Sequence, residues 1–369
     1  MIYLDHHAAA PTPEVVREAM EAAARWAWAN PSSAHAAGRA AKKLLEEARD
    51  HVAAALGSSP ADVVLTGGGT EACNLGIHGV ALGRGRMVTT VAEHPAVART
   101  IERLEASGKE VVRLEVPAGV PPAPSELRGT LDSESALALQ WINHETGTLF
   151  PVDAYAEVCA VTGAALFIDA TQALGKVPID VGDLGADAVA IAAHKVGGPA
   201  GAGACWVRRG LDVEPVAAGG SQERGRRPGT PDTLSMVGFG AACLPVVARI
   251  EAQPSTGRLR DPVETALLDL GAVRNGDGPR ASTVTNVSFE GWEGAHLAAA
   301  MDLEGVCLST GAACSSGLQA PSEVLLAMYP DEQWRAGSAI RISLGMETNR
   351  AEIDQVIRAF RRVLARRSG

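Results

Sequence analysis

The chain has 369 residues, of which 46% are hydrophobic and 21% charged, and its formal net charge is −10. A typical domain has about half this length, so we expect one large and one smaller domain with a sizeable core. The acidic balance and the dispersed basic residues argue against direct binding of nucleic acid, because phosphate binding needs a basic surface. No apolar run reaches the length of a membrane span, and no charged and apolar leader opens the sequence.

The six cysteines are scattered along the chain and form no CxxC pair. In a chain of this length, that distribution indicates free thiols in a reducing compartment, not a disulfide framework or a zinc site. We therefore expect a cytoplasmic protein without a metal site. The cysteines are Cys73, Cys159, Cys205, Cys243, Cys307 and Cys314.

Strand-like and helix-like segments alternate through the first two thirds of the chain. Helical patterns occur at 46–56, 71–82 and 96–108. Apolar strand patterns occur at the start of 62–74 and within 86–94, 110–116, 136–147, 164–172, 187–195 and 203–209. Apolar strands separated by helices are typical of a mostly parallel sheet with helices on both faces.

The alternation stops near Leu244. From there the sequence predicts a long helix, followed by strand-like segments within 282–291, 303–317 and 340–345. This pattern indicates a smaller α+β unit. We expect a large domain over 12–246 and a small domain made of 1–11 and 247–369.

The glycines at 67–69, followed by Thr70, stand between a predicted strand and a predicted helix. Glycine backbone lets N–H groups converge at a helix N-terminus, and the threonine adds a hydroxyl, so the segment can hold a phosphate. It matches neither G-x-G-x-x-G nor a Walker loop, so no nucleotide is indicated. Taken alone, the segment fits a plain tight turn equally well.

Polar residues follow three further strands. His94 and Asp169 could be structural, as a hydrogen-bonded surface histidine and a helix N-cap, and a strand-end lysine such as Lys195 is usually solvated. Their order along the chain changes this interpretation, because each follows a successive strand. A phosphate cradle, a histidine, Asp169 with Gln172, and a lysine beside apolar walls are the parts that pyridoxal phosphate requires.

These residues and the motifs around them closely resemble the cysteine desulfurases of the NifS/IscS type, in the class V aminotransferase group of fold type I pyridoxal-phosphate enzymes. Ten ordered motifs over nearly the whole chain carry the resemblance: IYLDHHAAAP, NPSSAHAAGRAA, TGGGTEACN, AEHPAV, NHETG, DATQALGKVPID, HKVGGPAGAG, GGSQERGRRPGT, STGAACSSG and SAIRISLG. It implies a seven-stranded, mostly parallel sheet between helices in the large domain, and a smaller α+β domain with a catalytic cysteine.

The resemblance implies a role for each residue around the cofactor ring. Lys195 holds pyridoxal 5'-phosphate as an imine on its amine. Asp169 pairs with the pyridinium nitrogen, and Gln172 contacts the phenolic oxygen. His94 lies over the ring and relays protons, and His144 stands where the family commonly has an asparagine that contacts the ring oxygen.

Further positions match residues that hold the phosphate and the substrate. Gly69, Thr70 and His194 would hold the phosphate of their own subunit. Thr230 would reach the phosphate of the neighbouring subunit, which implies a homodimer. Arg341 would bind the α-carboxylate of the substrate in bidentate fashion.

The resemblance implies a sulfurtransferase that converts L-cysteine to L-alanine. The thiolate of Cys314 attacks the substrate sulfur and retains it as a persulfide, a role suited to a small, polar loop. The sulfur then passes to an acceptor protein, either an iron–sulfur scaffold or a tRNA-thiolation enzyme. The spacing from Cys314 to Arg341 resembles the long-loop branch of the family, which hands sulfur to scaffold proteins.

The sequence departs from the family pattern at three places. Besides His144, Ala192 replaces the usual serine two residues before the phosphate histidine, and alanines at 8–10 replace Ala-Thr-Thr. We expect changed cofactor affinity or substrate choice, because no residue of a covalent step is lost. A selenocysteine lyase or another class V enzyme is one alternative. A catalytically impaired scaffold or regulator is another, against which the joint presence of Lys195 and Cys314 argues.

Overall fold

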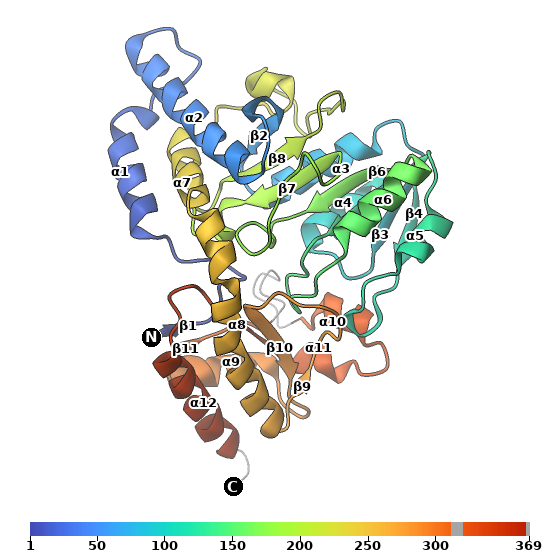
Figure 1. Ribbon diagram of the computed structural model, residues 1–369, viewed down its shortest axis with the longest axis vertical. Coiled ribbons are helices and arrows are strands. Elements are labelled where there is room, and N and C mark those ends of the chain that lie inside the picture. Colours follow the sequence, from blue (N-terminus) through green and yellow to red (C-terminus); the bar gives the residue numbers. More distant parts are fainter. Residues whose placement is uncertain (311–319, 367–369) are drawn as a thin grey trace.

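The computed structural model describes residues 1–310 and 320–366 (Figure 1). The helices are α1 (Glu14–Ala27), α2 (Ala36–Ala55), α3 (Gly69–Ala81), α4 (Pro95–Ala106), α5 (Pro124–Thr130), α6 (Val152–Thr162), α7 (Thr233–Cys243), α8 (Val246–Asp269), α9 (Gly294–Leu303), α10 (Glu323–Met328), α11 (Trp334–Ser338) and α12 (Arg350–Ala365). The strands are β1 (Ile2–Tyr3), β2 (Val63–Thr66), β3 (Arg86–Thr90), β4 (Glu110–Leu114), β5 (Ser135–Gln140), β6 (Ala165–Asp169), β7 (Ala188–Ala192), β8 (Gly203–Val207), β9 (Val273–Arg274), β10 (Val284–Ser288), β11 (Val306–Cys307) and β12 (Ala339–Ser343).

The main sheet has, within the described residues, seven strands in the order β2-β8-β7-β6-β5-β3-β4. The strands from β7 to β4 are parallel, and β8 is antiparallel to both of its neighbours. Because β8 is antiparallel to both β2 and β7, β2 and β7 run in the same direction. The expected mostly parallel, seven-stranded sheet is confirmed.

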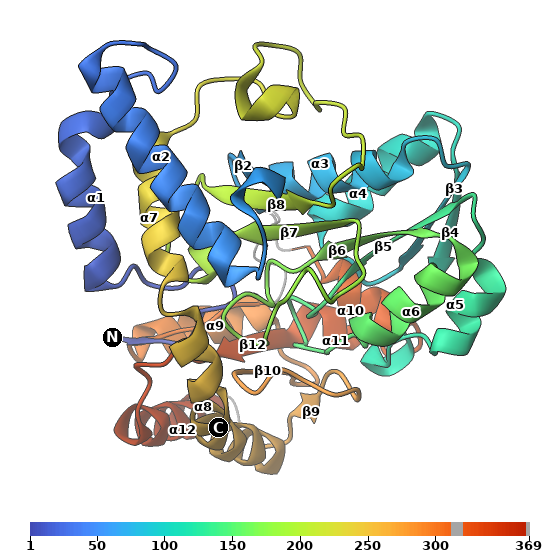
Figure 2. The same cartoon turned by 45° about the horizontal axis from the view of Figure 1, so that its top comes forward.

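Each face of this sheet has its own apolar core. In β5, Ala136 and Ala138 belong to the core under α3 and α4, whereas Leu137 and Leu139 belong to the core that also includes residues of α2, α6 and α7. Successive side chains of a strand point to opposite faces, so a strand covered on both sides is apolar throughout. Figure 2 shows the sheet between these helix layers.

The second part of the chain forms a smaller sheet in which β10 pairs antiparallel with β12 and β9. The first strand, β1, joins this part by pairing with β11. The apolar core beneath them includes Leu4, Leu267, Leu297 and Phe360, which come from the N-terminal segment, α8, α9 and α12. The expected smaller α+β unit is therefore present, while its exact boundaries stay a prediction.

The long helix expected after Leu244 is α8, which runs from the main sheet down to the smaller one (Figure 1). Pro245 lies between α7 and α8. No single helix among the described residues is long and apolar enough to span a membrane; α7 and α8 pass that test only as a pair, bent by 56°.

Gly203 at the start of β8 brings the loop after β2 close to the centre of the sheet. It pairs with Thr66 of β2 on one side and with Ala192 of β7 on the other. A Cβ at this position would lie 2.6 Å from the carbonyl carbon of Gly68. The absence of a side chain at Gly203 therefore allows the glycine loop and the end of β7 to lie together.

Glu93, just after β3, is a buried carboxyl with one hydrogen-bond donor. Its side chain is 5% exposed, and Thr90 Oγ1 donates to Oε1 at 2.6 Å. Burial is the largest cause that raises the pKa of Glu93 to about 8, and the charge of Asp169 acts in the same direction. The folded protein therefore binds a proton here that the unfolded chain releases above its ordinary pKa.

We predict that Glu93→Gln changes the pH dependence of stability. Because the folded pKa lies above the unfolded one, the wild type loses stability as pH rises from about 4.5 to 8. The amide does not titrate, so the variant keeps its stability across that window. Relative to the wild type, its free energy of unfolding should therefore rise by about 2–5 kcal/mol between the two pH values. Urea unfolding at several pH values measures the difference. The exposed Glu157→Gln on α6 is the control, and equal slopes for all three proteins would contradict the prediction.

Candidate active site

The carboxyl ends of β2, β3, β5, β6 and β7 lie at the same edge of the main sheet, where ligands of such sheets bind. The structure brings together the strand-end residues that the sequence indicated. The rings of His94 and His144 meet edge to face, with centroids 4.9 Å apart. Asp169 ends β6 and Lys195 follows the neighbouring β7 at the same edge. Burial lowers the pKa of His94, and the charges of Asp169 and Lys195 act on it in opposite directions.

Lys195 ends a short 3₁₀ turn (Ala193–Lys195) that directly follows β7. Its Nζ donates to the carbonyl oxygens of His7 at 2.6 Å and of Ala8 at 3.0 Å. The amine is therefore held over the edge of the sheet by the N-terminal segment. A lysine fixed in this way is suited to form an imine with an aldehyde.

His94 is the N-cap of α4, and its Nδ1 accepts a hydrogen bond from the Ala96 amide at 3.1 Å. In the neutral ring this contact leaves the proton on Nε2. Burial lowers the pKa of His94, the positive charge of Lys195 adds to this, and Asp169 opposes it. The ring is thus fixed by the backbone of its own helix.

Asp169 at the end of β6 is 4% exposed, and its Oδ1 accepts from the Thr171 amide at 3.0 Å. Gln172 lies on the same turn, and its Nε2 donates to the His7 carbonyl at 2.8 Å. Lys176 donates to the Gln172 side-chain oxygen at 2.7 Å. This contact sets the direction of the Gln172 amide, so its donor end faces Lys195 and the N-terminal segment.

The loop after β2 forms the expected cradle at the N-terminus of α3. Gly68 adopts φ 140°, a conformation that favours glycine, and Gly69 is the first residue of the helix. A Cβ on Gly69 would lie 3.0 Å from both Ala192 and Thr171. Thr70 is exposed beside the open N–H groups, and such a helix end attracts a phosphate.

His194 precedes Lys195 in the turn after β7. Burial lowers its pKa to about 4, and the charge of Lys195 contributes in the same direction. The ring is therefore neutral near pH 7 and can donate one hydrogen bond to an anion without adding a charge.

Arg341 on β12 reaches this edge from the smaller sheet and is 3% exposed. Its Nη2 donates to Asp5 at 2.7 Å, and its Nη1 donates to the His144 carbonyl at 2.9 Å. Its Nε has no hydrogen-bond partner among the described residues. One edge of the guanidinium is thus held in place while a buried donor stays available for a carboxylate.

Two residues that we did not predict complete the site. Glu145 is buried behind His144, accepts from Ser322 Oγ at 2.6 Å, and lies 3.7 Å from His144 Nε2. Burial raises the pKa of Glu145 to about 7. His7 is 1% exposed, and its carbonyl accepts from both Lys195 and Gln172. The sequence could have indicated both residues, because Glu145 lies in the motif NHETG and His7 lies in the motif IYLDHHAAAP.

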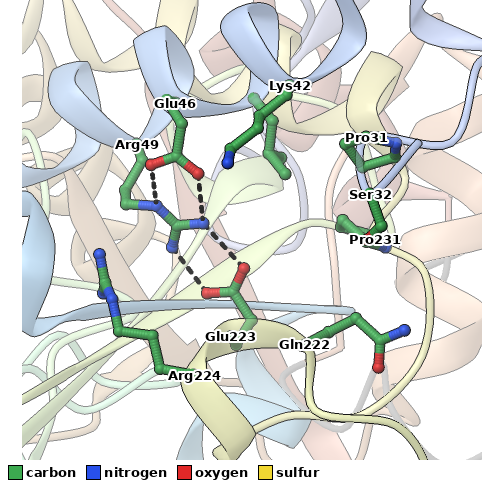
Figure 3. A pocket seen from close by; sticks show the side chains of 10 residues that line it. Pro31, Ser32, Lys42, Glu46, Arg49, Gln222, Glu223, Arg224 and Pro231 are labelled. Carbon is green, nitrogen blue, oxygen red and sulfur yellow. Dashed lines mark hydrogen bonds and ion pairs between the residues drawn. The ribbon is translucent and has the colours of Figure 1, made fainter. Parts of the chain in front are cut away.

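The loop that carries Thr230 is anchored by a buried ion pair (Figure 3). Arg49 of α2 contacts Glu223 at 2.6 Å, and both side chains are almost fully buried. Glu223 also accepts from the Leu65 amide and has φ 49°, so the ion pair holds a strained turn. Arg227 pairs with Glu71 in the first turn of α3. Thr230 itself is exposed, and among the described residues its side chain makes no hydrogen bond to the site.

Cys314, the predicted sulfur acceptor, lies outside the described residues. The other five cysteines form no disulfide among the described residues. Burial raises the pKa of four of these thiols, well above the ordinary value or to about 12, so they are poor nucleophiles: Cys73, Cys159, Cys205 and Cys243. Cys307 is partly exposed, and burial also raises its pKa.

Comparison with known proteins places this geometry in a family. Residues 2–356 match the family model for class-V aminotransferases. An IscS-like cysteine desulfurase of Mycobacterium tuberculosis is 38% identical, with 99% of this chain and 97% of that protein covered. A cysteine desulfurase of Bradyrhizobium diazoefficiens is 37% identical, with 99% and 95% covered.

Solved structures agree with the sequence comparison. A NifS-like protein superposes with a TM-score of 0.90 at 30% identity, covering 99% of both chains. SspA in complex with cysteine superposes with a TM-score of 0.80 at 28% identity, covering 95% of this chain and 100% of that one. With a family model matched over most of its length and full-length relatives above 30% identity, this chain belongs to the class-V aminotransferase family.

Proposed function

We propose that this protein is a pyridoxal-phosphate-dependent cysteine desulfurase that removes the sulfur of L-cysteine and leaves L-alanine. One observation carries the proposal: a lysine, a buried carboxylate, a histidine and an arginine converge beside a phosphate cradle at one sheet edge. The relatives named cysteine desulfurases match over nearly the whole chain and support the same activity.

The residues of the site fit the cofactor that members of this family use. His144 Nδ1 and Arg341 Nε are buried donors or acceptors without a partner among the described residues, as expected where a polar ligand binds. The close packing around Gly69 leaves the helix N-terminus open to a phosphate. Lys195, Asp169 and Gln172 would hold the ring. When bound, pyridoxal phosphate supplies an electron sink for the charge that develops at the substrate Cα.

Lys195 then has two tasks, both at Nζ. It would hold the cofactor aldehyde covalently, and as a free amine it would accept the proton from the substrate Cα. The His7 and Ala8 carbonyls keep Nζ at this place during both steps. Asp169 would hold a proton on the pyridine nitrogen, and His94 would cover one face of the ring.

Arg341 binds the carboxylate of cysteine and so orients the Cα–H bond towards Lys195. Asp5 holds Nη2 of this arginine in place, since the two are joined at 2.7 Å in a largely buried pair. His144, whose pKa lies well below its ordinary value because of burial, is a neutral group. In the place of the family's asparagine it can still donate one hydrogen bond to the cofactor oxygen.

Cys314 accepts the sulfur in this proposal. Its thiolate attacks the substrate sulfur, the S–S bond forms, and the Cβ–S bond breaks. The electron pair of that bond goes to the three-carbon fragment, which takes up protons and leaves as alanine. Cys314 retains the sulfur as a persulfide, which a second protein removes by thiol attack.

The wider setting is part of the same proposal. The exposed Thr230 loop supports a homodimer in which each subunit completes the phosphate site of the other. The acceptor protein is an iron–sulfur scaffold or a tRNA-thiolation enzyme, and the reducing cytoplasm is the setting that suits free thiols. The division into 12–246 and the two segments 1–11 and 247–369 places Arg341 and Cys314 in the small domain and Lys195 in the large one.

The central test adds L-cysteine to the purified protein and measures alanine and sulfide. Lys195→Ala should be colourless and inactive, because the covalent link to the cofactor is lost. Cys314→Ser should keep the yellow colour and lose sulfide release. Wild-type sulfide output from Cys314→Ser would refute the persulfide assignment, and a yellow, active Lys195→Ala would refute the whole proposal.

A second prediction concerns the substrate carboxylate. Arg341→Lys replaces a planar, bidentate donor by a point charge, so the KM for cysteine should rise about tenfold or more. Steady-state kinetics of alanine formation measures KM and kcat separately, and kcat should fall less than KM rises. Arg358→Lys, at an exposed position of α12, is the control. An unchanged KM in Arg341→Lys would show that another group binds the carboxylate.

A further inference from the structure

A small cavity lies beside Lys195. Its volume is about 50 Å³, and its walls come from the N-terminal segment, the turn after β6, α8 and the loop after β12. Of the residues assigned to the cofactor and substrate, only Lys195 lines it. The cavity is therefore a separate space from the phosphate cradle and from Arg341.

The charged groups around this cavity are all cations. Lys176, Lys195 and Arg249 line it, and no aspartate or glutamate does among the described residues. Burial lowers the pKa of Lys176 well below its ordinary value, and the charge of Lys195 lowers it further. Burial lowers the pKa of His6, which also lines the cavity, to about 4, so this ring adds no charge at neutral pH.

The positive charge of Arg249 is not paired with a carboxylate among the described residues. Within the part of the chain that the structure describes, its side chain forms no hydrogen bond or ion pair, and its Nε is buried. Burial lowers the pKa of Arg249, and the exposed Glu347 opposes this shift only in part, without forming an ion pair. A half-buried guanidinium without an acceptor is costly unless a ligand supplies one.

A second unpaired donor faces the same space. Thr283 lines the cavity and is 3% exposed, and its Oγ1 has no hydrogen-bond partner among the described residues. Buried hydroxyls nearly always have a partner. Lys176 uses two contacts, to the carbonyl and side-chain oxygens of Gln172, and retains a third N–H. The available groups are thus donors on a lysine, an arginine and a threonine.

We propose that this cavity binds a small monovalent anion of halide type, held by Arg249, Lys176 and Thr283. An anion accepts from every donor and offsets the positive charge of Arg249, which has no ion pair among the described residues. A cavity of about 50 Å³ has room for a halide and a water molecule but not for pyridoxal phosphate. The proposal adds a site to the enzyme and does not depend on the identity of its substrate.

The test uses the holoenzyme, so that the cofactor phosphate already fills its own cradle. Thermal unfolding is followed at constant ionic strength while sodium gluconate is replaced stepwise by sodium bromide. The wild type should show a saturable rise in Tm of about 2 °C, because a ligand that binds only the folded state stabilises it. Crystals soaked in bromide should show an anomalous peak between Arg249 and Thr283.

Three variants separate this site from a general salt effect. Arg249→Met keeps the side-chain stem and should lose the rise, and so should Thr283→Val, which keeps the volume and removes only the hydroxyl. Arg258→Met, at an exposed position of the same helix, should keep it. An equal rise in Arg249→Met and wild type, stabilisation by sulfate but not bromide, or no anomalous peak in the cavity would each overturn the proposal.

Discussion

The site depends on the contact between the N-terminal segment and Lys195. The carbonyls of His7 and Ala8 accept from Nζ, and the His7 carbonyl also accepts from Gln172. The same segment pairs with β11 through β1, and Asp5 holds Arg341. A few residues at the start of the chain thus connect the lysine on the main sheet with the arginine on the smaller one.

In the proposed function, this arrangement lets a residue of the smaller unit bind a substrate held at the main sheet. Arg341 donates hydrogen bonds to Asp5 and to the His144 carbonyl, so the position of its guanidinium depends on both the smaller sheet and the main sheet. Catalytic groups on rigid strands need such ties, because small displacements of a reacting atom cost much of the rate. The pairing of β12 with β10 provides the rigidity on one side, and the N-terminal segment provides it on the other.

Charge is distributed unevenly around Lys195. Asp169 and the buried Glu93 lie on the β3 and β6 side, where burial raises the pKa of Glu93. Lys176 and Arg249 lie on the other side, with no carboxylate in the wall of their cavity among the described residues. A bound anion there would neutralise the positive charge of these residues, because an unpaired cation in a poorly solvated place is unfavourable. The amine therefore stands between an acidic and a basic environment.

Much of the fold and of the site was predictable from local sequence. The apolar runs ending at His94, Asp169 and Lys195 predicted the strands and their order, because burial on both faces leaves a continuous apolar pattern. The glycines before Thr70 predicted a helix N-terminus open to a phosphate. The resemblance to a known family then suggested His144 and Arg341 as partners of these residues.

The sequence by itself thus determined the strand and helix pattern, the polar residues at the strand ends and the family. Only the tertiary structure decided that His7 and Ala8 hold Lys195, that Asp5 holds Arg341, and that Arg249 and Thr283 share a cavity. Lys195 and His7 are 188 positions apart, and Arg341 and Asp5 are 336 apart. Hydrophobic periodicity and turn chemistry are local signals, whereas such contacts arise from how the two sheets pack against the N-terminal segment.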